Sequence, residues 1–157
     1  MLEHGWSEEV GAFTQHFDSA DLDAAALMLP IVGFSPPDPR VLSTLDAIEK
    51  HLMDSRGLLL RYRTDTGIDG LGGDEGSFLL CTFWLAQVSA LAGRTGHARE
   101  VFERAISYAN DVGLLSEEVD STSGELLGNF PQAFSHIGLL NAAWAIHQAE
   151  RRAKRKS

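Results

Sequence analysis

The residues best suited to chemistry are carboxylates in loops between helical segments. Glu117 and Glu118 lie inside a long loop that runs from 111 to 130. An ionised carboxylate in a polar, partly solvated loop can hold a water molecule and act as a general base. Taken alone, however, two adjacent glutamates are more simply explained as a solvated pair on a loop.

A second acidic pair, Asp74 and Glu75, lies directly before an apolar segment that starts at Ser77. An aspartate at the N-cap and a glutamate in the first turn both favour the start of a helix, because their negative charge faces unpaired backbone N–H groups. This pair therefore predicts a helix start.

Other common chemistries find no support in the sequence. The six histidines are scattered, and none is three or four residues from another, so metal-ligand spacing is absent. The glycines between 66 and 76 are not followed by a lysine, which a phosphate-binding loop requires. No Ser/His/Asp motif is present either, and we expect neither a metal nor a cofactor.

Composition narrows the class of protein further. The 157 residues carry a net charge of -9, which disfavours nucleic-acid binding, and no apolar run is long enough to cross a membrane. The first ten residues lack the features of a secretory signal. The single cysteine, Cys81, lies in an apolar run, which predicts a buried, inert thiol and a reducing, cytoplasmic compartment. The basic residues from Arg151 to Lys156 are best explained as a solvated helix end.

Helical periodicity dominates the chain, and no alternating strand pattern is convincing. It predicts helices over 7–17, 20–29 (ended by Pro30), 39–52, 77–92 and 95–110, and a final helix opened by Pro131 that carries Phe134, Ile137, Leu140, Ala143 and Trp144. Asp38 caps the helix that begins at Pro39. The 77–92 segment is apolar around nearly its whole circumference, so we expect burial on all sides and a stop at Gly93.

Buried and amphipathic helices thus alternate, and long loops rich in glycine and aspartate precede the buried ones. This organisation favours an all-α protein of the α/α toroid type, in which loops at one rim build the site. The alternative is a plain helical-repeat protein, but no second copy of any segment recurs at a fixed period.

Three segments in this order and spacing resemble glycoside hydrolase family 15, which includes glucoamylases, glucodextranases and some trehalases. They are residues 58–84 (LLLRYRTDTGIDGLGGDEGSFLLCTFW), 110–120 (NDVGLLSEEVD) and 128–143 (GNFPQAFSHIGLLNAA). The resemblance covers nearly the whole chain. It implies that residues 1–157 form about the C-terminal half of an (α/α)6 toroid.

The resemblance also implies an inverting hydrolase that releases glucose from terminal α-glucosidic bonds, including those of trehalose. Such enzymes use two carboxylic acids, one that protonates the leaving oxygen and one that activates water on the opposite face. The base segment of the family matches 116–120 here, which assigns the base to Glu117, with Glu118 as the fallback. The family's general acid follows a tryptophan, but Trp6, Trp84 and Trp144 are not followed by Glu.

The chain therefore resembles a truncated hydrolase whose isolated form is inactive. A half toroid also exposes apolar faces, which favours self-association. A non-catalytic helical remnant or an interaction module is the alternative.

Six residues match family positions that contact the sugar: Arg61, Tyr62, Asp74, Glu75, Phe134 and His136. Each also has a structural alternative. Arg61 can form forked hydrogen bonds to hydroxyls or lie free on the surface. Phe134 can stack on a sugar but is more simply a core residue, and His136 can be a hydrogen-bonded rim residue. For Asp23, in the matching LDA segment, a structural hydrogen bond at a helix end is expected.

Overall fold

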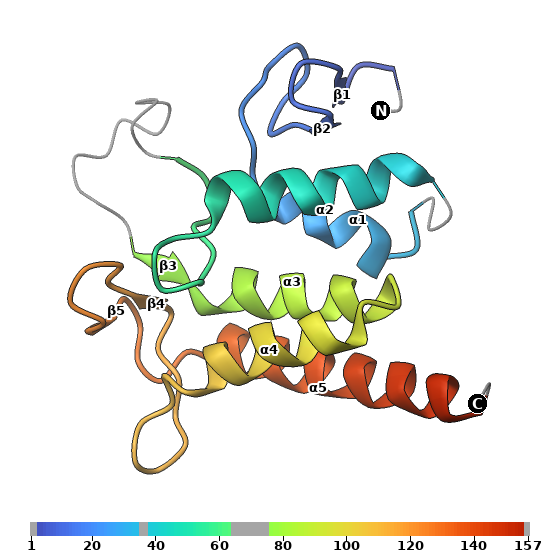
Figure 1. The fold of residues 1–157 in the computed structure, drawn as a ribbon. Coiled ribbons are helices and arrows are strands. Elements are labelled where there is room, and N and C mark those ends of the chain that lie inside the picture. Colours follow the sequence, from blue (N-terminus) through green and yellow to red (C-terminus); the bar gives the residue numbers. More distant parts are fainter. Residues whose placement is uncertain (1–2, 35–37, 64–75, 156–157) are drawn as a thin grey trace.

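The computed structural model describes residues 3–34, 38–63 and 76–155. The helices are η1 (Ala24–Leu27, a 3-10 helix), α1 (Met28–Ile31), α2 (Pro39–Leu52), α3 (Leu79–Leu91), α4 (Thr95–Ile106) and α5 (Ala133–Lys154). The strands are β1 (Trp6–Ser7), β2 (Ala12–Phe13), β3 (Ser77–Phe78), β4 (Glu118–Val119) and β5 (Leu126–Leu127). Figure 1 shows α3 between α1 and α2 on one side and α4 and α5 on the other. None of the described helices is both long and apolar enough to cross a membrane.

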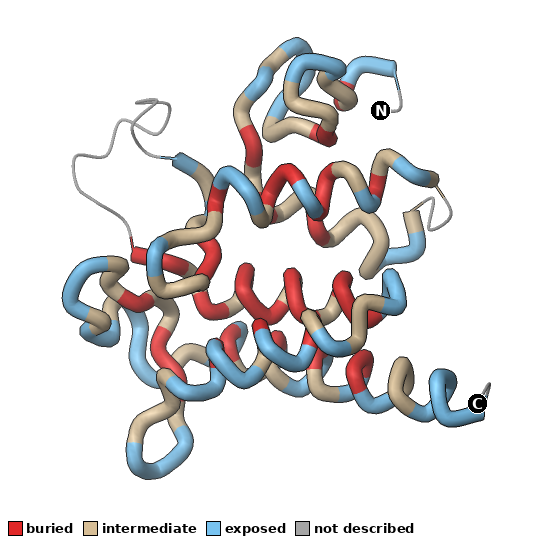
Figure 2. Tube along the Cα trace, in the orientation of Figure 1, coloured by how far each residue is buried: buried red, intermediate tan, exposed pale blue. Residues whose placement is uncertain are grey.

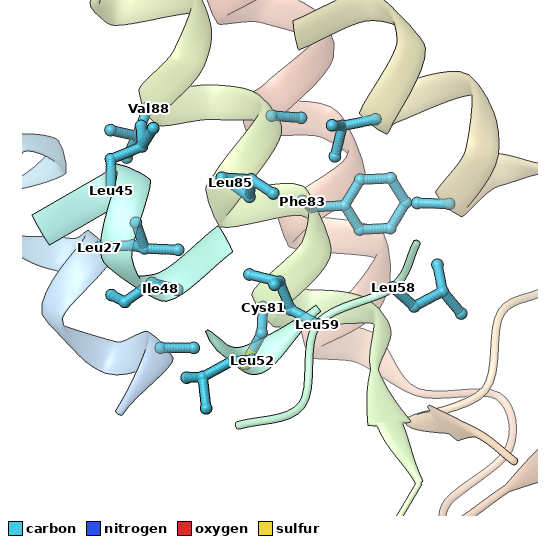
Figure 3. Packing of buried hydrophobic residues seen from close by; sticks show 14 of the residues in the cluster. Leu27, Leu45, Ile48, Leu52, Leu58, Leu59, Cys81, Phe83, Leu85 and Val88 are labelled. Atoms are coloured by element: carbon cyan, nitrogen blue, oxygen red, sulfur yellow. The ribbon is translucent and has the colours of Figure 1, made fainter. Parts of the chain in front are cut away.

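Helix α3 forms the centre of the core, as its all-round apolar sequence predicts. Nine of its thirteen residues are buried, and Figure 2 shows this central burial along the helix. Leu85 and Val88 pack toward α2, while Phe83 packs on the α4 side against Phe102 (Figure 3). Burial raises the pKa of the Cys81 thiol to about 12, so this cysteine stays protonated and inert. The helix ends before Gly93, whose φ of +80° suits a residue without a side chain.

Helix α2 also begins and ends as predicted. The Asp38 side chain accepts a hydrogen bond from the Arg40 N–H, and Pro39 occupies the first helical position, where its missing N–H costs nothing. The predicted apolar stripe is buried: Val41, Leu45, Ile48 and Leu52. The cap and the stripe together fix both the start of α2 and the face that it presents to the core.

The N-terminal region differs from the prediction. The expected helix over 7–17 is wrong, because β1 and β2 form an antiparallel hairpin there. Gly11 has a φ of +61°, which a helix interior does not allow. The Phe13 N–H donates to Thr44 Oγ1 at 2.9 Å, and this contact ties the hairpin to α2. The strands are too short to produce an alternating pattern in the sequence.

The predicted helix over 20–29 is also replaced, by η1 followed by α1. Asp23 caps η1 by accepting a hydrogen bond from the Ala25 N–H at 2.7 Å, which confirms its structural role. Pro30 lies inside α1 and does not end it. A proline is tolerated there because first-turn N–H groups have no partner within the helix.

Helix α4 spans 95–106, so it stops earlier than the predicted 110. Ala98, Val101 and Ala105 are buried as expected, whereas Ile106 is exposed at the helix end. Polar contacts join α4 to its neighbours: His97 Nε2 lies 2.9 Å from Glu49 Oε1 on α2, and Arg99 forms an ion pair with Glu150 on α5. Such partly exposed contacts contribute little stability, so the apolar face of α4 holds it in place.

Helix α5 packs on α3 through small residues. Its buried positions are Ser135, Gly138, Ala142, Ala145 and Ile146. A Cβ at Gly138 would lie 3.0 Å from Leu80 Cδ1 and 3.1 Å from Phe83 Cβ, so the glycine permits the close approach of the two helices. Four large apolar residues of α5 face away from this seam and are exposed, namely Phe134, Ile137, Leu140 and Trp144, whereas Ile146 is buried.

Candidate active site

The Glu117 segment joins the N-terminal ends of α3 and α5. The Leu79 N–H at the start of α3 donates to the Glu117 carbonyl at 3.1 Å. The Glu117 N–H donates to the Asn129 carbonyl at 3.0 Å, in the chain that leads into α5. Strand β4 pairs with β3 on one side and β5 on the other, and Figure 1 shows this small sheet beside both helix starts. The backbone around Glu117 is therefore fixed from two directions.

The Glu117 carboxylate is held at one oxygen. Its Oε2 accepts hydrogen bonds from the Asn129 N–H at 3.0 Å and from Asn129 Nδ2 at 2.8 Å. Gly128 has a φ of +71°, and a Cβ there would lie 2.9 Å from Glu117 Oε2. Within the described part of the chain, Oε1 accepts no hydrogen bond, so this oxygen is available to hold water.

Glu118 has a different environment. Its Oε2 accepts a hydrogen bond from the Gly76 N–H at 2.9 Å, beside the start of β3. A Cβ on Gly76 would lie 2.8 Å from the Val119 carbonyl oxygen, so the two segments are in close contact. Because successive side chains along a strand point to opposite faces, Glu118 faces away from the Glu117 side. Glu118 therefore holds the start of β3, whereas Glu117 is held by Asn129.

Two buried serines support the backbone on either side of Glu117. Ser116 Oγ donates to the Glu118 carbonyl at 2.7 Å, and Ser135 Oγ on α5 donates to the Ser116 carbonyl at 2.7 Å. Both serines are fully buried. Ser135 and Asn129 could not be recognised from the sequence, although both lie in the motif 128–143, because their partners lie 12 to 19 residues away.

His136 lies one turn into α5 with a defined tautomer. Its Nδ1 is 2.7 Å from the Gln132 carbonyl oxygen. A carbonyl cannot donate, so Nδ1 carries a proton, and in the neutral imidazole Nε2 is an acceptor. Nε2 is buried and has no hydrogen-bond partner among the described residues. An unpaired buried acceptor costs about 1–3 kcal/mol, so this nitrogen is suited to a water or ligand hydroxyl.

Phe134 is 63% exposed, so its interpretation as a core residue is wrong. The reason is that the buried face of α5 consists mainly of small residues and does not include Phe134. The Phe134 ring is accessible to a sugar or to another part of a protein.

Arg61 and Tyr62 belong to a second segment that contacts the start of α3. The Phe78 N–H donates to the Leu59 carbonyl at 2.8 Å, so the 59–62 segment and the Glu117 segment bind adjacent N–H groups at the start of α3. Arg61 is half exposed and lies 3.7 Å from Asp23 Oδ1, with its guanidinium 5.9 Å from the Tyr62 ring centroid. Tyr62 lines a hollow of about 140 Å³.

Asp74 and Glu75 lie outside the described residues. Because α3 begins at Leu79 with Phe78 at its N-cap and Ser77–Phe78 forms β3, the prediction that this pair caps the helix is wrong.

In the part of the chain that the structure describes, no group of three or more His, Cys, Asp or Glu side chains could hold a metal ion. Among the described residues, Glu117 and His136 lie in segments joined to the start of α5, while the hollow beside Tyr62 is lined by residues of the N-terminal region such as Gln15, Leu22 and His51.

Comparisons with known proteins agree on the family. The model of "Glycosyl hydrolases family 15" matches residues 2–144. A trehalase of Thermoplasma volcanium is 48% identical over 150 residues, which cover 95% of this chain and 24% of the relative. A trehalase of Mycobacterium tuberculosis is 44% identical over 154 residues, which cover 98% of this chain and 22% of the relative. The chain thus spans about a quarter of the length of these relatives.

Solved structures give the fold. This chain superposes on a wild-type glycosidase with a TM-score of 0.71 at 22% identity. The match covers 93% of this chain and 41% of the glycosidase chain. A variant glycosidase with a tyrosine-to-phenylalanine substitution superposes with a TM-score of 0.72 at 23% identity, with the same coverage. The prediction of a partial (α/α)6 toroid is confirmed.

Proposed function

Since this chain belongs to glycosyl hydrolase family 15, we propose that it supplies the general-base half of an inverting hydrolase that cleaves terminal α-glucosidic bonds. The observation that carries this proposal is the Glu117 carboxylate, which Asn129 holds at Oε2 while Oε1 is open among the described residues. A general base needs this combination of a fixed position and a free oxygen to orient the attacking water.

The reaction needs a second carboxylic acid on the opposite side of the glycosidic bond. We place this general acid outside the 157 residues, because none of the three tryptophans is followed by the glutamate that the family motif requires. Under this proposal the isolated chain is inactive, and residues 1–157 are the second half of a catalytic domain.

Trehalose is the first candidate substrate, since the relatives that cover most of this chain are named trehalases. In this proposal, Arg61 and Tyr62 contact the sugar from the 59–62 segment. Phe134 and His136 contact it from the start of α5, where His136 Nε2 accepts a hydrogen bond from a hydroxyl or a bound water. Other α-glucosides fit the same half of the site.

The test is to restore the missing half. This chain is joined to the part of the T. volcanium trehalase that precedes the matching segment, and glucose release from trehalose, maltose and isomaltose is measured. We expect activity in the joined protein and none in the 157-residue chain. Activity of the isolated chain at a comparable rate would refute the placement of the acid. If the joined protein folds and is inactive on all three sugars, the chain is a non-catalytic helical module.

A further inference from the structure

A turn at residues 54–58 lies between the end of α2 and the 59–62 segment, and one carboxylate holds its backbone. Asp54 Oδ1 accepts hydrogen bonds from the Arg56 N–H and from the Leu58 N–H, both at 2.8 Å. The Asp54 N–H in turn donates to the Leu58 carbonyl at 2.9 Å. An aspartate that bonds the backbone ahead of it in this way stabilises a turn, so the Arg56 side chain extends from a fixed backbone.

The side chains of Asp54 and Arg56 contact two different parts of the small three-stranded sheet. Asp54 Oδ2 accepts a hydrogen bond at 2.7 Å from the hydroxyl of Ser77, a fully buried residue of β3. Arg56 donates from Nε to the Ser121 carbonyl at 3.1 Å and from Nη2 to the Thr122 carbonyl at 2.5 Å. Figure 1 shows the sheet that these contacts reach. One short turn therefore holds β3 and the turn between β4 and β5.

The Arg56 guanidinium fits closely into the 121–124 turn that joins β4 to β5. A Cβ on Gly124 would lie 3.0 Å from Arg56 Nη1 and 3.1 Å from its Cζ, so the guanidinium lies directly against the Gly124 backbone. The Gly124 N–H donates to the Asp120 carbonyl at 2.9 Å, which closes the turn. A guanidinium presents its donors in a rigid plane, so its two hydrogen bonds define the position of the turn and not merely its charge.

The β4–β5 hairpin carries Glu117 at the end opposite this contact. Strands β4 and β5 are two residues long each, and beyond them the Glu117 N–H donates to the Asn129 carbonyl at 3.0 Å. A hairpin this short is not stable by itself in water, so its position depends on contacts with the rest of the chain. Arg56 supplies such a contact at the 121–124 turn, and β3 supplies another along β4.

We propose that Arg56 is a positioning residue for the general base. By holding the 121–124 turn against the 54–58 turn, it fixes the hairpin, and with it Glu117, relative to the 59–62 segment. This inference rests on the proposed function, in which Glu117 activates water and the 59–62 segment contacts the sugar. A displacement of about 1 Å can lower the rate of a catalysed reaction about a hundredfold, so a contact outside the site can affect catalysis.

Hydrogen exchange of the 157-residue chain tests the contact without catalysis. In Arg56→Gln, we expect the Glu117 and Gly124 amides to exchange about tenfold faster and the amides of α3 to be unchanged, because the hairpin opens locally. Arg104→Gln is the matched control, since Arg104 Nη1 donates to the Gly57 carbonyl at 3.4 Å and so contacts the same turn from α4. Unchanged exchange at Glu117 in Arg56→Gln, or equal acceleration in both variants, overturns the proposal.

Kinetics of the hydrolase joined from this chain and the T. volcanium segment test the effect on the base. Arg56→Gln should lower kcat about tenfold and leave the KM for trehalose within about twofold, because Glu117 acts on water and not on sugar binding. Arg56→Lys keeps the charge but not the two fixed donors, so it should restore kcat only in part.

Three kinetic results would overturn the proposal: a loss of stability with kcat unchanged, a change confined to KM, or full recovery of kcat in Arg56→Lys. If the joined hydrolase is inactive before any substitution, the proposed function fails. Hydrogen exchange then still decides whether Arg56 holds the hairpin.

Discussion

Glu117 and Glu118 are neighbours in the chain, but their carboxylates accept hydrogen bonds from different segments. Glu118 accepts a hydrogen bond from the Gly76 N–H and so holds the start of β3. Glu117 is fixed at one oxygen by Asn129, and its other oxygen is open among the described residues. Adjacent residues of the same type can therefore have separate roles, because the strand turns their side chains to opposite faces.

Exchanging each carboxylate for an amide should produce the largest contrast. In the joined hydrolase, Glu117→Gln should lower kcat about 10²- to 10⁴-fold, because an amide cannot accept a proton from water. Glu118→Gln should change kcat little and lower the unfolding free energy by about 1 kcal/mol, through a weaker hydrogen bond to Gly76. Steady-state kinetics and denaturant unfolding measure both. Equal losses of kcat in the two variants would remove the distinction.

Removing the Asn129 side chain that holds Glu117 should have a smaller effect on kcat. Asn129→Ala deletes the Nδ2 hydrogen bond but leaves the backbone N–H of residue 129 in place. We expect kcat to fall about tenfold to a hundredfold, because the carboxylate gains freedom to leave its reactive position. The KM for trehalose should change less than kcat. A change confined to KM would instead indicate that Asn129 contacts the substrate.

A side chain at Gly128 should disturb Glu117 by contact. In Gly128→Ala, the new Cβ lies 2.9 Å from Glu117 Oε2, so the carboxylate must move. We expect kcat to fall about tenfold and stability to fall by about 1 kcal/mol. Gly113→Ala is the control, since its φ of +81° imposes similar backbone strain while nothing lies within 4 Å. It should lose stability and keep kcat.

The smallest effect should come from Asp120, the third carboxylate of the segment, through the dependence of stability on pH. Hydrogen bonds from the N–H groups of Ser123 and Thr122, followed by the nearby Arg56, lower the pKa of Asp120. Because the pKa is lower in the folded state, this contribution to stability is present above the unfolded pKa and is lost as pH falls through the folded one. Asp120→Asn removes the titrating group, so the loss of stability below about pH 4 should become less steep. The unfolding midpoint, measured against pH in both proteins, checks this, and identical slopes would contradict it.

The parts of the fold that the sequence predicted are those with local signals. Helix α2 carries its cap and its stripe within 15 residues, and α3 is apolar on all sides. The N-terminal hairpin was missed because Gly11 and the bond from Phe13 to Thr44, 31 residues away, outweigh helical periodicity. The exposed side of α5 was misassigned at Phe134, because periodicity locates a stripe but not the partner that covers it.

In the candidate site, too, local motifs could be predicted from the sequence and long-range contacts could not. The motif around Glu117 pointed to the residue, while its supports, Asn129 and Ser135, come from distant positions that only the fold brings together. Asp74 and Glu75 lie outside the described residues, so their predicted contact with the sugar stays a prediction.

The most direct test of Glu117 as the base is rescue by azide. In the joined hydrolase, Glu117→Ala leaves room for azide, which can attack the anomeric carbon from the face that water normally uses while the sugar oxygen departs with the general acid's proton. We expect Glu117→Ala to lose hydrolysis and, with azide, to form β-glucosyl azide detectable by proton NMR, whereas Glu118→Ala should hydrolyse trehalose normally. Formation of that azide by Glu118→Ala, or full hydrolysis by Glu117→Ala, would contradict the assignment.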